Sequence, residues 1–501
     1  MMNDGGSNTF VGSGQSGWEP TFLYVANIGS RFGIVISLAM LLPAAIDLRD
    51  GDENWRVFVT SAACSGIFYL LLALATAKRE ARFTPRLGFL LTTTLWVVAA
   101  ATGCVPLYFS AIDMSLAAAF FESMSGITTT GSTVLTGLDD LPRGLLLWRS
   151  MLQWVGGVGF VGLALLMLPS LRIGGVQLFQ MESSDRSDKI LPRVAQIASG
   201  IVIAYVVLTG LCFAAYILVD MSTFDALNHA MTTVSTGGYS THDASMGYYA
   251  YDRRVLVVST LFMALGALPF ILYVKFVIPG RLSYKINPQI SLFFAIVLFS
   301  STVLAISLCI VKDANFFDAF IRSSFNLVSV ITTTGYASED YTLWGQVAVA
   351  IFLLTTFLGG CAGSTSGGIK MNRLIYLWQY ARVSLVHLNT RNAVVKMRYG
   401  SSAISIETAQ TAVLFFFLYM VSLIVGSTVL MALGLDIVTS ITGSLTALSN
   451  VGPGFGPTIG PAGNFSTLPN SALWVLSILM LIGRLEIIAV VMLCTRAFWS
   501  R

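Results

Sequence analysis

Charged residues are scarce in this chain. Of its 501 residues only 11% are Asp, Glu, Lys or Arg, and histidine occurs three times. A soluble domain carries about 25% charged residues, so the composition excludes an ordinary soluble protein. The net charge of +4 is too small to indicate a nucleic-acid partner. Apolar residues take the place of charge: 55% of the residues are hydrophobic, which predicts a polytopic membrane protein embedded in the lipid bilayer.

Motifs of catalysis and cofactor binding are also lacking. The three histidines are far apart and form no H-E-x-x-H pattern, which argues against a zinc protease. The six cysteines lie in or beside apolar segments without a C-x-x-C pair, and we interpret them as small buried apolar residues. No nucleophile is paired with a base, so we expect no enzyme. Residues 157–162 match G-x-G-x-x-G, but they lie in an apolar span, which favours helix packing over nucleotide binding.

Ten long apolar segments and four short ones follow one another along the chain. The long ones begin near residues 32, 58, 87, 144, 194, 255, 290, 342, 408 and 471, and each is near the roughly 20 residues that cross a bilayer. The short ones cover 115–127, 222–234, 317–331 and 436–448. They are too short to cross, and the Gly-rich turn after each is typical of a re-entrant helix. Ser222 and Asn315 have the position of N-terminal caps.

After an initial helix pair, the order long helix, short helix, loop, long helix repeats four times. We therefore predict an all-α polytopic membrane protein of about ten transmembrane helices, with these four repeats in a pseudo-four-fold arrangement. Basic residues gather in loops on one side, which the positive-inside rule makes cytoplasmic, so the loops after the short helices face outward. The basic groups are Lys78 to Arg86, Arg172 to Arg193, Arg281 with Lys285, and Arg373 to Arg398. The first 20 residues predict a flexible tail.

A run of polar residues that ends in glycine follows each short helix, at intervals of about 100 residues. A glycine there allows a left-handed backbone that turns carbonyl groups toward a common axis. Rings of backbone carbonyls replace the water shell of a bare monovalent cation in selectivity filters. We therefore predict that one chain carries four filter strands, formed by Thr129, Thr130, Gly131, Ser235, Thr236, Gly237, Thr333, Thr334, Gly335, Asn450, Val451 and Gly452.

Acidic residues lie near the outer ends of these loops. Either they form a solvated loop face, or their charge attracts cations to the mouth of a pore. The residues are Asp139, Asp140, Asp243, Glu339 and Asp340.

Ten small residues interrupt the eighth long segment. They occupy positions 359–368, beginning about 17 residues into that segment. Irregular backbone at membrane depth is tolerated only where protein buries it or a water-filled cavity meets it. We predict a gate below the filter, and the alternative is a close-packing patch of small residues between helices. The gate residues are Gly359, Gly360, Gly363, Ser364, Thr365, Ser366, Gly367, Gly368 and Lys370.

Arg484 lies about 14 residues into the last span, where an unpaired charge costs at least a few kcal/mol. A bridge to Glu486 has poor geometry, because residues two apart on a helix point to different sides. We predict a pore-facing cation that interacts with the gate. The alternatives are a structural pairing with another helix and snorkelling toward the cytoplasmic surface.

Together these motifs resemble the superfamily of Trk, Ktr and HKT potassium transporters, in particular its TrkH-like bacterial members. The resemblance covers nearly the whole chain and rests on the four loops, on residues 362–370 and on 483–486. It implies K⁺ uptake across the bacterial inner membrane, filter glycines at 131, 237, 335 and 452, a gating loop at 359–368 and a pore arginine at 484. In the plant branch a serine at the first of these glycines accompanies sodium transport, so four glycines favour potassium.

The resemblance also implies partners and an internal organisation. We expect a homodimer with one pore per subunit, and a separate cytoplasmic ring of TrkA-like subunits that bind NAD or ATP/ADP. This chain itself would hold K⁺ as the transported ion and no organic cofactor. The expected units are the tail with the extra helix pair (1–80), three repeats at 81–185, 186–285 and 286–400, the last with the gate loop, and a fourth repeat at 401–501.

A secondary transporter, in which H⁺ or Na⁺ movement drives K⁺, is the second hypothesis. It needs an ionisable residue in the pore at mid-membrane that changes charge during transport. Arg484 is the one candidate that the sequence offers, and a guanidinium does not deprotonate in proteins. The sequence therefore favours a gated pore.

Overall fold

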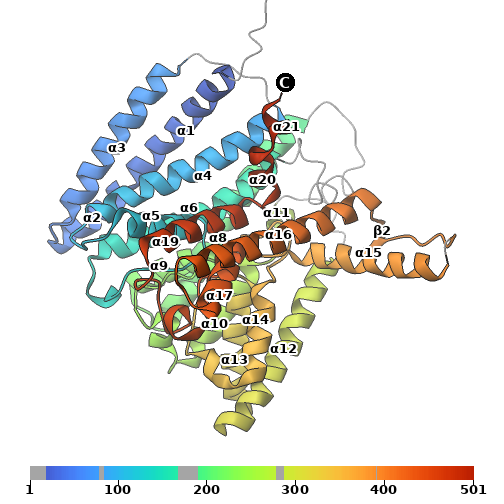
Figure 1. Cartoon of the computed structure of the whole chain (residues 1–501). Helices are drawn as coiled ribbons and strands as arrows, with labels where there is room; N and C mark the ends of the chain where they lie inside the picture. Colours follow the sequence, from blue (N-terminus) through green and yellow to red (C-terminus); the bar gives the residue numbers. More distant parts are fainter. Residues whose placement is uncertain (1–18, 78–83, 168–189, 278–286, 391, 501) are drawn as a thin grey trace, which may run out of the picture.

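The computed structural model describes residues 19–77, 84–167, 190–277, 287–390 and 392–500, and helices dominate it (Figure 1). The helices of the first half are α1 Glu19–Ala39, α2 Leu41–Asp50, α3 Trp55–Ala75, α4 Pro85–Tyr108, α5 Leu116–Ile127, α6 Arg143–Met167, α8 Ile190–Leu218, α9 Thr223–Val234, α10 Arg253–Gly266 and α11 Phe270–Val277. Those of the second half are α12 Pro288–Lys312, α13 Phe316–Ile331, α14 Gln346–Thr356, α15 Met371–Asn389, α16 Ile406–Ala432, α17 Ile437–Ser449, α18 Gly456–Ile459, α19 Asn470–Arg484, α20 Ile488–Cys494 and α21 Arg496–Trp499. The 3-10 helices η1 Leu138–Asp140, η2 Ser245–Tyr249 and η3 Tyr341–Trp344 and a hairpin of β1 Arg398–Tyr399 with β2 Ser402–Ala403 complete these elements.

The prediction of a helical protein with several membrane-spanning segments is confirmed. Six described helices are long and apolar enough to cross a bilayer, namely α1 continued by α2, α3, α4, α8, α12 and α16, and the pair α19 and α20, bent by 113°, makes a seventh. The spans expected from residues 255 and 342 are each divided, into α10 and α11 and into α14 and α15. The count of ten therefore stays a prediction.

The first span starts at Glu19, whereas the apolar pattern placed its beginning near residue 32. Asn27 explains the difference, because its side-chain amide donates to the Ala73 carbonyl at 3.0 Å and to the Thr76 hydroxyl at 3.1 Å on α3. These hydrogen bonds to the end of α3 satisfy the polar Asn27 side chain inside the span, although a polar residue lowers the hydropathy from which the span was predicted.

The four short helices are confirmed nearly to the residue as α5, α9, α13 and α17. Each begins at a side chain that accepts a backbone N–H of the first turn: Ser115, Ser222, Asn315 and Asp436. These caps satisfy backbone N–H groups that have no partner within the first turn of a helix.

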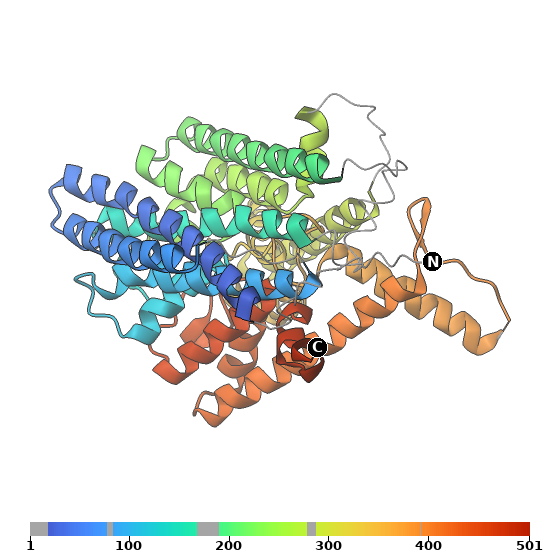
Figure 2. The same cartoon turned by 90° about the horizontal axis from the view of Figure 1, so that it is seen from above.

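The long helices surround the short ones. In Figure 1 α1, α3 and α4 lie at one edge, and in both views the hairpin of α15 and α16 reaches out of the helical body (Figure 2). Exposed leucine, isoleucine, valine and phenylalanine side chains cover the outward faces of α3, α8, α12 and α16, as lipid requires. Two cysteines, Cys64 on α3 and Cys494 on α20, lie on exposed surface, which corrects the expectation that all six are buried.

Several expectations lie outside the described residues. They are the N-terminal tail and most of the basic loop residues at 78–83, 172–189 and 281–285.

Asp47 joins the N-terminal helix pair to the rest of the molecule. Its fully buried carboxylate accepts the backbone N–H of Gly144 in the first turn of α6 at 2.5 Å and the side-chain amide of Asn54 at 2.8 Å. A carboxylate at a helix N-terminus is favourable because the free N–H groups carry positive partial charge. This carboxylate therefore connects two elements that are 97 residues apart.

We expect Asp47→Ala to lower the free energy of unfolding by about 2–3 kcal/mol, because two buried donors lose their acceptor. Thermal unfolding of the detergent-solubilised protein measures the effect. Asp50→Ala is the control, since Asp50 pairs with Arg143 near the surface at 3.6 Å, and such a pair contributes up to about 1 kcal/mol. Equal losses in the two variants would contradict the anchoring role of Asp47.

Candidate functional site

The four short helices all end in the same unusual backbone turn. After α5, the N–H of Thr129 donates to the residue three positions earlier and the N–H of Thr130 to the residue five positions earlier, both at 2.9 Å. The other three loops repeat this pattern. Its first residue has a left-handed backbone in every case, with φ of 54° at Thr129, 53° at Thr236, 59° at Thr333 and 56° at Asn450. A non-glycine residue adopts this conformation only at a cost, so four copies at equivalent positions indicate a specific geometry.

The shared turn corrects the alignment of the second loop. The glycine two positions after the left-handed residue is Gly131, Gly238, Gly335 or Gly452, with φ between 80° and 105°. The predicted equivalent in the second loop was Gly237. That residue instead matches Thr130, Thr334 and Val451. The sequence pattern misled because the second loop ends in two glycines, and only the backbone distinguishes which of them takes the left-handed position.

The four loops meet in a ring. A methyl group added to any of the four left-handed glycines would lie no more than 2.8 Å from a backbone carbonyl oxygen of the next loop. Gly131 faces Gly237, Gly238 faces Thr334, Gly335 faces Val451, and Gly452 returns to Thr130. Each glycine is therefore required by a close approach as well as by its own φ. One polypeptide thus brings four carbonyl-bearing turns around a common centre.

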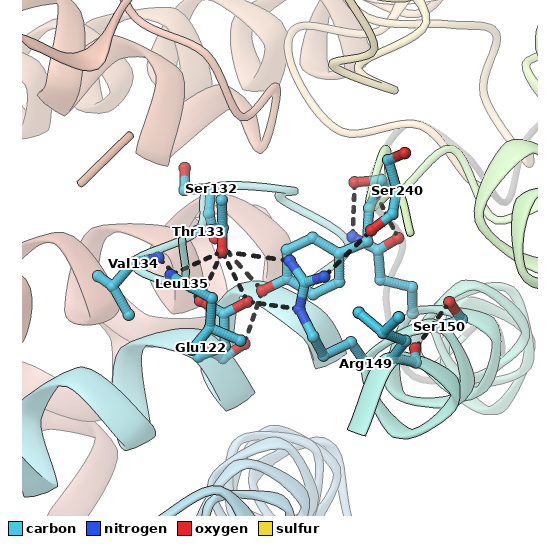
Figure 3. A network of polar contacts seen from close by, with 12 residues as sticks. Glu122, Ser132, Thr133, Val134, Leu135, Arg149, Ser150 and Ser240 are labelled. Carbon is cyan, nitrogen blue, oxygen red and sulfur yellow. Dashed lines mark hydrogen bonds and ion pairs between the residues drawn. The ribbon is translucent and has the colours of Figure 1, made fainter. Parts of the chain in front are cut away.

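A buried ion pair lies behind the first and second loops. Figure 3 shows Arg149 reaching from α6 toward Glu122 of α5 on one side and Ser240 on the other. The guanidinium donates to the Glu122 carboxylate at 2.8 Å and to the Ser240 carbonyl at 3.1 Å, and it stacks on the Tyr239 ring at 4.1 Å. Glu122 also accepts the N–H of Val134 at 2.9 Å. The pair therefore fastens the segments that follow the first and second turns to α5 and α6.

The stretch of small residues is not helical, so the predicted interruption of the eighth long segment is present. It runs from the end of α14 to the start of α15, and Leu358 and Ile369 close it by a parallel bridge. Gly363 and Gly368 adopt φ of 81° and 64°, and Phe270 donates to the Gly363 carbonyl at 2.9 Å. Ser364 bonds to the Cys361 carbonyl, and a side chain at Gly359 or Gly360 would collide with residues 366–368.

This stretch packs against three of the four loops, those that follow α9, α13 and α17. Its Thr365 hydroxyl lies 3.2 Å from the Val234 carbonyl at the end of α9, and the Gly367 N–H donates to the Thr333 hydroxyl at 2.7 Å. A methyl group on Gly367 would overlap the Ser449 carbonyl at the end of α17. The ring and the stretch of small residues are therefore in direct contact.

Arg484 is buried, with 1% of its surface exposed, which excludes snorkelling. Its guanidinium donates to the Thr365 carbonyl at 2.8 Å and to the Gly156 carbonyl of α6 at 3.4 Å. The predicted contact with the gate stretch is therefore present, and it is made to backbone oxygen. Lys370, at the end of the same stretch, donates to the Ser366 carbonyl.

We predicted that Glu486 does not bridge to Arg484, and in the structure Glu486 pairs with another residue. Its carboxylate pairs with Arg373 of α15 at 2.5 Å, across the break between α19 and α20. Glu122, Arg149 and Gln153 were not singled out from the sequence, and Arg373 was predicted only as part of a basic cytoplasmic group. A charge inside an apolar span was the signal for Arg149. Gln153 carried no such signal.

Most outer acidic residues have local partners. Asp139 pairs with His242, and Glu339 lies 3.1 Å from Lys312. Burial lowers the pKa of His242, but its hydrogen bonds to Asp225 and Asp139 and their negative charges outweigh burial and raise it above the ordinary value. Asp340 accepts the N–H of Thr342, and Asp140 is exposed in η1. Asp243 lines an outer cavity of about 590 Å³ together with Thr133 and Asn464.

Comparisons with known proteins agree with one another. The model of the TrkH family, described as a cation transport protein, matches residues 55–500. The Trk system potassium uptake protein TrkI of Halomonas elongata is 40% identical over 490 residues, which are 97% of each chain. TrkH of Escherichia coli K12 is 32% identical over 494 residues, covering 95% of this chain and 99% of that one. The crystal structure of the potassium transporter TrkH from Vibrio parahaemolyticus superposes with a TM-score of 0.86, at 31% identity, over 96% of this chain and all of the other.

We expect Glu122→Leu to destabilise the protein by about 3–5 kcal/mol, because it leaves a buried guanidinium without its carboxylate. The double variant Glu122→Leu with Arg149→Met should lose less than the single one, since no lone charge remains. Thermal unfolding of the two purified variants measures both effects. A double variant that is less stable than the single one would contradict this account of the pair.

Proposed function

Because this chain belongs to the TrkH family of cation transport proteins, we propose that it takes up K⁺ across the bacterial inner membrane through the ring of four loops. The observation that carries the proposal is the closure of the ring, in which each left-handed glycine abuts a carbonyl of the next loop. Backbone carbonyls in such a ring replace the hydration shell of a monovalent cation.

The filter proposal assigns one strand to each repeat. The strands are residues 129–131, 236–238, 333–335 and 450–452, with Ser235 at the base of the second. They belong to the repeats at 81–185, 186–285, 286–400 and 401–501, which follow the helix pair at 1–80. The pairing of Asp139 and Glu339 with cationic neighbours supports a solvated loop face, and Asp243 in the cavity beside Thr133 supports attraction of cations there.

The gate proposal concerns residues 359–370 and Arg484. The stretch of small residues touches the ends of three filter loops, so a closed position directly below the ring is consistent with its contacts. Arg484 stabilises that position through the Thr365 carbonyl and adds positive charge beneath the filter. Movement of the stretch then admits ions.

Regulation and assembly are assigned as the family resemblance implies. We propose a homodimer, filter loops facing outward, and cytoplasmic TrkA-like subunits that bind NAD or ATP/ADP. The projecting hairpin of α15 and α16, with exposed Arg382 and Arg398, is a contact surface of suitable charge for such a subunit or for anionic lipid. Copurification with a TrkA-like protein distinguishes a protein partner at this surface from anionic lipid.

Coupling to H⁺ or Na⁺ is the alternative function. One observation favours it: Lys370, with 4% of its surface exposed, lies in the gate stretch, and unlike arginine a buried lysine can lose its proton. A pore needs no such change of charge, so K⁺ uptake that is unaffected by a proton or sodium gradient favours the pore.

We expect purified wild-type protein in KCl-loaded liposomes to take up ⁸⁶Rb⁺, with block by external K⁺ and little block by Na⁺. Gly131→Ser should let Na⁺ block about as well as K⁺, because a side chain there displaces the Gly237 carbonyl.

Gly137→Ser is the matched control for this variant. Gly137 also has a left-handed φ, of 69°, but no atom lies within 4 Å of an added methyl group. It therefore introduces the same backbone strain away from the ring. Equal K⁺ and Na⁺ block in wild type, or unchanged selectivity in folded Gly131→Ser, would overturn the filter.

Deletion of residues 362–364 should raise the rate of ⁸⁶Rb⁺ uptake about tenfold, because the closed stretch loses contacts such as the Ala362 N–H to Gln289 at 2.9 Å and each such bond contributes about 1 kcal/mol. Size-exclusion chromatography and thermal unfolding establish that the variant is folded. Unchanged or abolished uptake in a folded deletion variant would rule out the gating role.

A further inference from the structure

We propose that Gln153 of α6 is a positioning residue for ion selectivity, which holds the second strand of the ring against the first. This inference rests on the proposed filter and deepens it. Gln153 is fully buried and lies directly behind Gly237.

The orientation of the Gln153 amide follows from its two partners. Its Oε1 accepts the backbone N–H of Tyr239 at 3.0 Å, and its Nε2 donates to the Gly237 carbonyl at 2.6 Å. A backbone N–H only donates and a carbonyl only accepts, so reversing the amide would break both bonds. One side chain thus fixes two backbone groups that lie two residues apart.

The second strand has space for this amide because it lacks a side chain at that point. Gly237 stands where the other strands have Thr130, Thr334 and Val451, and a methyl group added to it would overlap the Gln153 side chain. Glycine is also the residue with the greatest backbone freedom. The second strand, which has glycine where the other strands have a side chain, is therefore held by a hydrogen bond from Gln153 of α6.

Gln153 belongs to one face of α6 that follows the second loop. Arg149, Gln153 and Gly157 are spaced by four residues, so they lie on the same side of the helix. Arg149 bonds to the Ser240 carbonyl, Gln153 to Gly237, and a methyl group on Gly157 would contact Ser235. The face thus supports the strand along its whole length.

The equivalent helices of two other repeats lack this restraint. Gly156, Gly266 and Gly483 each pack on the carbonyl two positions before the left-handed residue of a turn, at Ile127, Val234 and Leu448, which gives a common register. Three positions before these glycines stand Gln153, Met263 and Met480. The methionine side chain has no N–H to donate, so these two repeats lack the amide restraint of the first and the ring is asymmetric.

The restraint acts on the position of an oxygen that belongs to the ring. The Gly237 carbonyl is the group that Gly131 abuts, so loosening it changes the spacing between the first two strands. Discrimination between K⁺ and Na⁺ depends on the number and placement of coordinating carbonyls. Selectivity, more than the rate of uptake, should therefore depend on Gln153.

We expect Gln153→Leu to reduce the preference for K⁺ over Na⁺ about tenfold in the ⁸⁶Rb⁺ competition assay, which corresponds to the loss of one or two hydrogen bonds. Total uptake should persist. Met263→Leu, at the same register in α10, is the control and should keep the wild-type ratio. Unchanged selectivity in folded Gln153→Leu would overturn the proposal.

Gln153→Glu provides a second test, which does not depend on the leucine variant folding. A protonated carboxyl group can accept from Tyr239 and donate to Gly237, whereas a carboxylate only accepts. Selectivity of this variant should approach that of wild type in acidic medium and fall in alkaline medium. Wild type at the same pH values controls for titration of other groups, and a pH-independent ratio in Gln153→Glu would contradict the proposal. If wild type itself shows no preference for K⁺, the proposed function fails, which is a different result.

Discussion

The backbone N–H and C=O groups of the four loops need hydrogen-bond partners from the protein, and the rest of the structure depends on this constraint. A turn inside a bilayer is stable only if protein supplies the hydrogen bonds that solvent would otherwise provide. Each loop meets this need first from its own short helix, whose last carbonyls accept the N–H groups of the turn. The remaining polar groups are bonded by side chains from other repeats, such as Gln153 and Ser132. The loops are therefore stable only as a set.

The same constraint explains the buried charges. Arg149 and Arg484 are both almost completely buried, and both donate to backbone carbonyls of loops that are neither helix nor strand. Guanidinium groups suit this role because several donors point in fixed directions from one planar group. Arg149 has a carboxylate partner in Glu122, and Arg484 donates to the carbonyls of Thr365 and Gly156. Arg149 therefore joins α5 and the second loop to α6, and Arg484 joins α6 and the stretch at 359–370 to the end of α19.

Much of the fold could be predicted from the residues alone. The four short helices end within one residue of their predicted ends, because capping side chains and Gly-rich turns mark helix boundaries locally. The first span was misplaced, since Asn27 is compatible with a membrane helix only through its bonds to α3. Gly237 and Gly238 could not be told apart for a similar reason: both can adopt a left-handed φ, and the neighbouring strand decides which one does.

The sequence by itself determined the class of protein, the short helices and the residues of three of the four turns, because hydropathy, capping and glycine placement are local properties. Only the tertiary structure decided how these turns meet, that the stretch at 359–370 lies against three of them, and which partners Glu122, Arg149, Gln153 and Arg373 contact. Those facts depend on contacts between residues far apart in the chain, such as Gln153 with Gly237 and Arg373 with Glu486. No local pattern encodes such a pairing, because each side chain is compatible with many partners until packing selects one.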